Sequence, residues 1–251
     1  MRCAARRLLA IAAIAAVTAG AQPPPPRPVG AAERQQAVGD LARLLRERYA
    51  IAGTAETAAA AIEQRLAAGR YDAFADARSF ADALTRDLQE ATGDKHLRVG
   101  EAPATAEAVA TPSAADRDVE RAVWQAGVRR SNNGFLRAEI LPGNVGYLDY
   151  RRFQPPDLTG DTLVATMAFF TNADALIIDL RNCRGGSAYT TPYFAAYFFD
   201  RSTHLFNMEF RGDNFTERFW THPWVPGKRL ATIPLYLVTS AYTFSGAEAM
   251  A

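Results

Sequence analysis

The chain has 251 residues, of which 49% are hydrophobic and 22% are charged, and this composition is typical of a globular protein with a real apolar core. Its formal net charge is +1, and without the three arginines of the first 21 residues the balance is 25 basic to 27 acidic side chains. This near-neutral balance argues against nucleic acid or an anionic membrane surface as a partner, because both require a basic excess.

Residues 1–21 have the pattern of a secretory signal peptide. Basic residues open the segment, an apolar stretch runs from Leu8 to Val17, and Ala19-Gly20-Ala21 forms a small-residue cleavage pattern. A membrane anchor is the alternative, although the apolar run is shorter than the roughly 20 residues of a span. We therefore expect a secreted or periplasmic protein with no stable membrane span after cleavage. Cys183 is then the only cysteine left, so no internal disulfide is possible.

The next predicted part is a helical domain. Residues 22–30 are a proline-rich spacer to which we assign no packing value, and residues 31–95 are predicted to form three helices. The helix boundaries follow from candidate N-caps and stops, which are Thr54, Ser79, Gly69 and Gly93.

Residues 96–134 are predicted to be a connecting segment. Its part from 101 to 117 is rich in Ala, Thr and Pro and is typical of a mobile connection, and a helix is expected from about residue 119.

Residues 135–251 alternate between predicted strands and helices, which indicates an α/β core. Two strands joined by a Pro-Gly-Asn turn are expected within 135–153, followed by a helix. The apolar strand that ends at Asp179 is typical of a central strand covered on both faces, so we expect helices on both faces of the sheet. An aromatic-rich helix, a hairpin around Gly212-Asp213-Asn214 and a second buried strand complete the pattern.

Two motifs follow the two buried strands, "RNCRGGS" and "SAYTFSGAE". Because ligands collect at the carboxyl ends of parallel strands, Gly185 and Gly186 are expected to face Ser245 across a crevice. The glycines would turn backbone N–H groups toward an anion, and the serine is a candidate nucleophile. Each motif has an alternative: Ser245 with Glu248 fits a capping box, and the glycines fit a helix-entry turn or a phosphate site.

Four stretches in this order resemble the carboxyl-terminal processing (tail-specific) serine peptidases, and more closely the branch that contains interphotoreceptor retinoid-binding protein. They are "TGDKHLRV", "GNVGYLDYRRF", "ALIIDLRNCRGGS" and "LYLVTSAYTFSGAEAMA". The resemblance covers about residues 31–251 and implies a crotonase-like αββ core behind the helical domain. It identifies Ser245 with the family's nucleophile.

The resemblance implies further roles, residue by residue. Gly246, with Gly185 or Gly186, matches the backbone donors of the oxyanion hole. His96 is similar to the general base of the tricorn-type members, with a surface or structural histidine as the alternative. Glu248 matches an acidic residue that orders the site in members with a Ser-Lys dyad, and it fits a capping role equally well.

The sequence also departs from this family. Dyad members place the lysine some two dozen residues after the serine, whereas the two lysines here are Lys95 and Lys228. The region between the helical domain and the core is too short for a PDZ domain. We therefore expect a chain that is truncated at its C-terminus, with an incomplete core and no activity alone, whose base is His96 or a lysine beyond residue 251.

Two functions remain open at this point. The first is a serine-type peptidase that acts on a peptide or protein substrate. The second is a binding protein for a hydrophobic ligand such as a retinoid or lipid, with the aromatic run of residues 189–199 lining its pocket, although such a stripe is more typical of a core. The joint presence of the serine, the glycine pair and the histidine favours the peptidase. No metal or organic cofactor is expected, because three histidines and one remaining cysteine show no ligand spacing, and no pattern indicates an oligomeric state.

Overall fold

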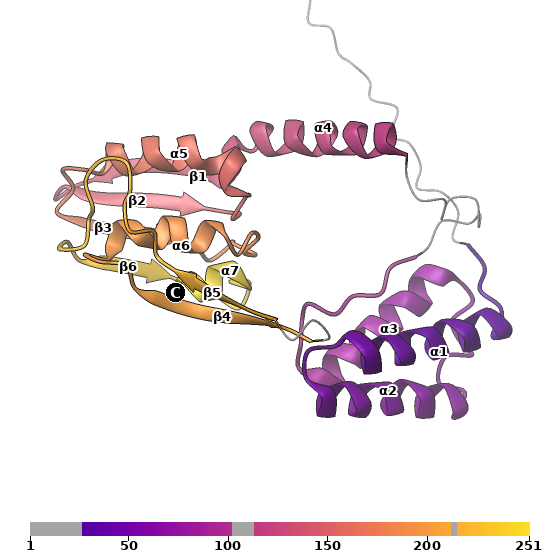
Figure 1. Ribbon diagram of the computed structural model, residues 1–251. Helices are drawn as coiled ribbons and strands as arrows, with labels where there is room; N and C mark the ends of the chain where they lie inside the picture. The colour runs from indigo at the N-terminus through magenta and orange to yellow at the C-terminus, as the bar shows by residue number, and fades with distance from the viewer. Residues whose placement is uncertain (1–26, 102–112, 212–214) are drawn as a thin grey trace, which may run out of the picture. The chain divides into compact units, whose positions relative to one another are not determined.

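Figure 1 shows the computed structural model of the protein, which describes residues 27–101, 113–211 and 215–251. The predicted signal peptide, residues 22–26 of the spacer, residues 102–112 of the connection and the predicted hairpin turn at 212–214 lie outside the described residues. Two compact units are present, one made of residues up to Ala42 with Ala60–Ala102, the other of Arg43–Ala59 with Pro103–Ala251. None of the helices among the described residues is long and apolar enough to cross a membrane.

The three predicted N-terminal helices are present as α1 (Ala31–Arg48), α2 (Ala52–Ala67) and α3 (Ala77–Thr92). Gly93 ends α3 in the left-handed conformation, with φ at 71°, as predicted. The predicted N-caps are wrong. Thr54 lies inside α2, and the cap of α3 is Asp76, whose carboxylate accepts the Ser79 N–H at 2.9 Å. An ionised carboxylate is at least as good a cap as a serine hydroxyl, and Ser79 becomes a donor to it.

The first unit has a small apolar core that includes the end of the spacer. Ala42, Ile62 and Leu84 are fully or almost fully buried, and the Tyr71 hydroxyl donates to Asp87 at 2.7 Å. Val29 is also buried, and its N–H donates to the Ala75 carbonyl at 3.0 Å. The prediction that the spacer has no packing value is therefore wrong for residues 27–30, because a β-branched side chain in extended backbone pairs with residues 75–76 there.

The second unit is built around a mixed four-stranded sheet with strand order β1-β2-β3-β6. Strands β1 (Phe135–Leu141) and β2 (Val145–Tyr150) form the predicted antiparallel pair. Strands β3 (Ala175–Asp179) and β6 (Leu235–Val238) are parallel to β2, with Asp149 opposite Asp179 and Asp179 opposite Val238. Because these strands are parallel neighbours, the chain leaves their carboxyl ends at one edge of the sheet.

One face of this sheet carries the hydrophobic core. Helices α5 (Pro156–Phe169) and α6 (Thr190–Ala195) pack their apolar residues against Leu148 and Ile178. The aromatic run is mainly core, as the more typical interpretation predicted: Phe194 and Tyr197 are buried in it, whereas Tyr189 is exposed.

The opposite face of the sheet is open over the described residues. It carries the row Glu139, Tyr147, Ile177 and Tyr236, in which Tyr147 and Ile177 are half-buried and Tyr236 is 58% exposed. The prediction of helices on both faces is therefore wrong for this part of the chain. Buried and partly exposed positions alternate along these strands. The sequence did not reveal this alternation, because isoleucine and tyrosine tolerate partial exposure.

Three further elements complete the second unit. Helix α4 (Ala114–Arg130) begins within the stretch that we expected to be a mobile connection, because Ser113 and Asp116 form a capping box there. Strands β4 (His204–Phe210) and β5 (Phe215–Trp220) pair antiparallel as the predicted hairpin. The short helix α7 (Gly246–Met250) follows Ser245.

Candidate active site

Two loops meet at the carboxyl edge of the sheet. The loop after β3 contains the predicted glycine pair, and the loop after β6 leads to Ser245. Three hydrogen bonds join them: Ser240 Oγ donates to the Arg181 carbonyl at 2.5 Å, Thr243 Oγ1 donates to the Leu180 carbonyl at 2.9 Å, and the Phe244 N–H donates to the Cys183 carbonyl at 3.2 Å. The structure therefore brings together the two motifs that the sequence indicated.

The glycines of the first loop are required by close backbone approach. Gly185 has φ of +70°, and a Cβ on it would lie 2.4 Å from the Phe244 carbonyl oxygen and 2.5 Å from the Gly246 nitrogen. Gly186 has φ of +145°, and a Cβ there would lie 2.0 Å from the Phe153 carbonyl oxygen. Real side chains do not tolerate such distances, so only glycine permits this contact between the loops.

Backbone donors are available where the loops meet. Burial raises the pKa of the Cys183 thiol in this loop to about 11. The Gly186 and Gly246 N–H groups have no hydrogen-bond partner among the described residues, and a Cβ on Gly246 would lie 3.6 Å from the Gly186 nitrogen. Two adjacent unpaired N–H groups are suited to bind one oxyanion.

Ser245 has an unusual backbone conformation. Its φ is 57° and its ψ is −124°, in the region that glycine normally occupies, whereas an N-cap residue normally has β-region angles. Glu248 Oε2 accepts the Ser245 N–H at 2.7 Å, so the acidic half of the capping box is formed. Capping alone does not require a strained serine, but a sharp strand-to-helix turn that presents its hydroxyl does.

An ionic network supports the glycine loop at its start. Asp179 is 4% exposed, and its carboxylate accepts the Arg181 N–H at 3.0 Å, the Arg181 guanidinium and the Tyr147 hydroxyl at 2.7 Å. The hydrogen bonds from Arg181 lower the pKa of Asp179 well below its usual value. The carboxylate therefore stays charged and fixes the turn whose carbonyls accept the bonds from the serine loop.

His96 lies in the first unit, and its relation to Ser245 stays a prediction. Its Nδ1 is 2.8 Å from Asp94 Oδ1, and its side chain is 58% exposed. The same carboxylate oxygen accepts the His96 N–H at 2.8 Å. The Asp-Lys-His spacing of residues 94–96 is the sequence signal that could have identified Asp94 as this partner.

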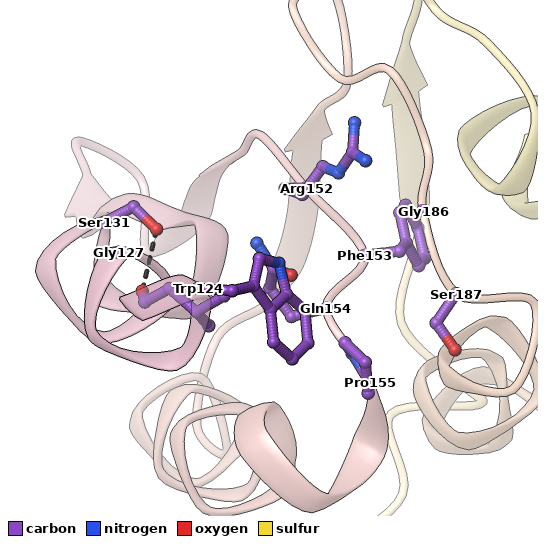
Figure 2. A pocket seen from close by; sticks show the side chains of 10 residues that line it. Trp124, Gly127, Ser131, Arg152, Phe153, Gln154, Pro155, Gly186 and Ser187 are labelled. Atoms are coloured by element: carbon purple, nitrogen blue, oxygen red, sulfur yellow. Dashed lines mark hydrogen bonds between the residues drawn. The ribbon is translucent and has the colours of Figure 1, made fainter. Parts of the chain in front are cut away.

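A groove of 720 Å³ opens beside the glycine loop (Figure 2). Its walls are α4, the segment after β2 and the glycine loop, and Gly186 belongs to both the groove and the predicted oxyanion hole. The lining residues are Trp124, Gly127, Val128, Ser131, Arg152, Phe153, Gln154, Pro155, Gly186 and Ser187.

Metal binding is not supported by any cluster in the described ranges. Within 27–101, 113–211 and 215–251 no group of three His, Cys, Asp or Glu side chains is placed to hold a metal ion.

Two family models match the sequence and together span most of it. Residues 31–127 match the N-terminal domain of Peptidase_S41 in eukaryotic IRBP, and residues 144–251 match peptidase family S41. These ranges contain His96 and Ser245, respectively.

Several solved structures are similar to the chain, with low scores. A Bacteroides fragilis protein assigned to the S41 proteases is 23% identical over 47% of this chain and 34% of its own length, with a TM-score of 0.39. The photosystem II D1 C-terminal processing protease is 16% identical over 44% of this chain and 28% of its own, with a TM-score of 0.32. A Parabacteroides merdae protein assigned as a peptidase is 15% identical over 88% and 71%, with a TM-score of 0.47. The aligned part of the chain thus spans about a third of the first two structures, and the family assignment rests on the sequence matches.

Proposed function

The chain belongs to peptidase family S41, and we propose that it serves as a secreted or periplasmic serine peptidase whose nucleophile is Ser245. The observation that supports this role most directly is the strained backbone of Ser245 beside two unpaired N–H groups. Strain of this kind persists where the surrounding structure enforces it, and it is concentrated at functional sites. Peptides or proteins are the proposed substrates.

In the proposed reaction, Ser245 Oγ attacks the carbonyl carbon of the scissile peptide bond. The oxygen of the tetrahedral intermediate accepts hydrogen bonds from the Gly186 and Gly246 N–H groups, which are available without reorganisation. Collapse of the intermediate releases the amine and leaves an acyl-enzyme, which water then hydrolyses. Removal of one such backbone donor typically lowers kcat by about 100-fold to 1000-fold.

His96 is the proposed general base. In this proposal its Nε2 accepts the proton of the serine and returns it to the leaving amine, while Nδ1 is hydrogen-bonded to Asp94. Asp94 would fix the tautomer and the orientation of the ring. A lysine beyond residue 251 is the competing base, in which case the His96–Asp94 pair only orders the local turn.

The family also supports finer proposals about fold and specificity. We propose that the second unit is the crotonase-like core of a tail-specific peptidase and that substrate selection depends on the cleft rather than on a PDZ domain. Glu248 is proposed to order the serine turn through its bond to the Ser245 N–H.

The decisive test of the proposed function is active-site labelling of the full-length secreted protein with a fluorophosphonate. Labelling is expected in the wild type and in Ser202→Ala, a serine that donates to Thr221 away from the two loops. It should be absent in Ser245→Ala. A folded wild-type protein without labelling would contradict the nucleophile role and would favour a binding protein for a hydrophobic ligand on the same scaffold.

A further inference from the structure

The groove beside Gly186 is continuous with the proposed oxyanion hole, and we propose that it is a substrate subsite with two selective walls. Trp124 and Pro155 would take an aromatic or long aliphatic side chain of an extended peptide, and Arg152 would take a carboxylate. This inference rests on the proposed function and names the substrate class: peptides with an apolar and an acidic side chain next to the scissile bond.

The floor of the groove is hydrogen-bonded to Gly134 at Arg151 and to the glycine loop at Phe153. The Arg151 N–H donates to the Gly134 carbonyl at 2.8 Å, and the Phe153 N–H donates to the Gly185 carbonyl at 2.9 Å. The Phe153 carbonyl in turn accepts the Ser187 N–H at 2.7 Å. A peptide that lies on residues 152–155 is thereby kept in fixed register with the Gly186 N–H group, as a subsite requires.

The first turn of α6 joins the floor to the serine as well. Thr190 Oγ1 donates to the Gln154 carbonyl, and Thr191 Oγ1 donates to the Gly246 carbonyl at 3.3 Å. Both threonines are fully buried. Their side chains therefore couple the position of the groove floor to that of the second proposed oxyanion donor.

Trp124 forms the apolar wall of the groove. It is 47% exposed, and Figure 2 shows its indole lying beside Gln154 and above Pro155. Val128 lies one turn further along α4 and is buried, which anchors this helix face to the unit. A large, half-exposed indole on an anchored helix can bury a substrate side chain at little entropic cost.

Arg152 supplies the charge of the groove. Neighbouring arginines are neutralised, since Arg151 pairs with Asp149 and Arg181 pairs with Asp179. Arg152 is exposed and forms no ion pair or hydrogen bond through its side chain within the described ranges. An unpaired guanidinium in a groove favours a carboxylate, with which it forms two parallel hydrogen bonds.

Several polar side chains in the lining disfavour a lipid or retinoid as occupant. Ser131, Gln154 and Ser187 line the groove with Arg152. Ser131 Oγ already donates to the Val128 carbonyl at 2.8 Å. However, an apolar ligand would leave the side chains of Arg152, Gln154 and Ser187 without hydrogen bonds, whereas a peptide backbone would satisfy them.

Peptide binding to the full-length Ser245→Ala protein tests the proposal, because this background blocks turnover. Fluorescein-labelled alanine-rich peptides that contain one Phe and one Glu are compared with their Glu→Gln and Phe→Ala counterparts by fluorescence polarisation. The Arg152→Gln variant is expected to weaken the Glu peptide about fivefold and to leave the Gln peptide unchanged. The Trp124→Ala variant should weaken the Phe peptides about tenfold, and Trp124→Phe should restore most of that loss.

Arg218→Gln on β5 and Trp224→Ala, whose side chain is 71% exposed, are matched controls outside the groove and should change neither affinity. Equal weakening of acidic and neutral peptides by Arg152→Gln, no measurable peptide binding, or displacement of the peptides by retinol or oleate would each overturn the groove proposal. Fluorophosphonate labelling of the wild type is scored separately. If Ser245 is labelled while the groove variants show no selectivity, only the subsite fails; if labelling is absent, the proposed function fails with it.

Discussion

The first unit and the paired loops of the candidate active site use left-handed glycines in different ways. Gly93 ends α3 with φ of 71°, and a Cβ on it would meet nothing within 4 Å. Gly185 has nearly the same φ of 70°, but a Cβ on it would collide with backbone atoms of residues 244 and 246. The first glycine satisfies a local rule of helix termination, whereas the second allows two distant segments to touch. The same backbone angle therefore has a local origin in the helices and a tertiary origin at the site.

The largest expected effect separates these two glycines directly. Gly185→Ala should destabilise the protein by about 4 kcal/mol and abolish serine labelling, because the new methyl group must displace the backbone of the serine loop. Gly93→Ala should cost only about 1 kcal/mol, the strain of a left-handed alanine. Urea unfolding of both variants measures the difference. Similar losses in the two variants would show that φ alone, and not the contact between loops, sets the requirement for glycine.

The next prediction concerns side-chain volume in the first unit. Ala42 of α1 is completely buried, so Ala42→Leu should cost about 2 kcal/mol by overpacking. Ala32→Leu lies on the exposed part of the same helix and should change stability by less than about 0.5 kcal/mol. Thermal unfolding of the two variants provides the measurement, and equal melting temperatures would mean that the core around Ala42 can expand freely.

A third prediction reverses the usual effect of a cap mutation. If Ser245 is a strained nucleophile, Ser245→Gly should stabilise the protein by about 1 kcal/mol while it eliminates labelling, because glycine adopts φ of 57° without strain. Ser245→Ala should retain the strain and gain nothing. An ordinary N-cap gives the other order, with alanine costly and glycine nearly neutral. The ranking of the two variants in urea titrations therefore distinguishes the two interpretations of the serine.

The smallest expected effect depends on pH. Hydrogen bonds from Arg181 lower the pKa of Asp179 below its ordinary value of 3.8, so the charged carboxylate stabilises the fold above pH 3.8 and this stabilisation is lost as the pH falls further. Asp179→Asn should cost about 1 kcal/mol at neutral pH, a modest value because the Arg181 side chain is solvent-exposed. The difference in free energy of unfolding between Asp179→Asn and the wild type should become smaller in acid.

Unfolding of Asp179→Asn from neutral pH to pH 2.5 follows this gap, with Asp200→Asn, an exposed acidic residue, as the control. A gap that is constant across the range would show that the stabilising interaction does not require the ionised carboxylate.

Much of the architecture followed from the sequence alone, because it depends on local chemistry. The pattern of residues 31–95 predicted three helices, and the glycine after α3 predicted where that helix ends. The Pro-Gly-Asn turn predicted the β1–β2 pair, and the two motifs after apolar strands predicted which loops would meet. Each of these features is determined by residues that are close in the chain.

Tertiary structure decided what local patterns could not. The open sheet face around Tyr236 is one such feature, because the exposure of this side chain depends on what packs against the sheet. The same is true of the contact between the loops: only the coordinates show that a Cβ on Gly185 would collide with the backbone of residues 244 and 246. The physical reason is that the contact of the loops depends on residues that are far apart in the chain. Thr243 and Leu180, which a hydrogen bond joins, are 63 positions apart. Composition and residue spacing do not determine the distances in space between residues that are far apart in the chain.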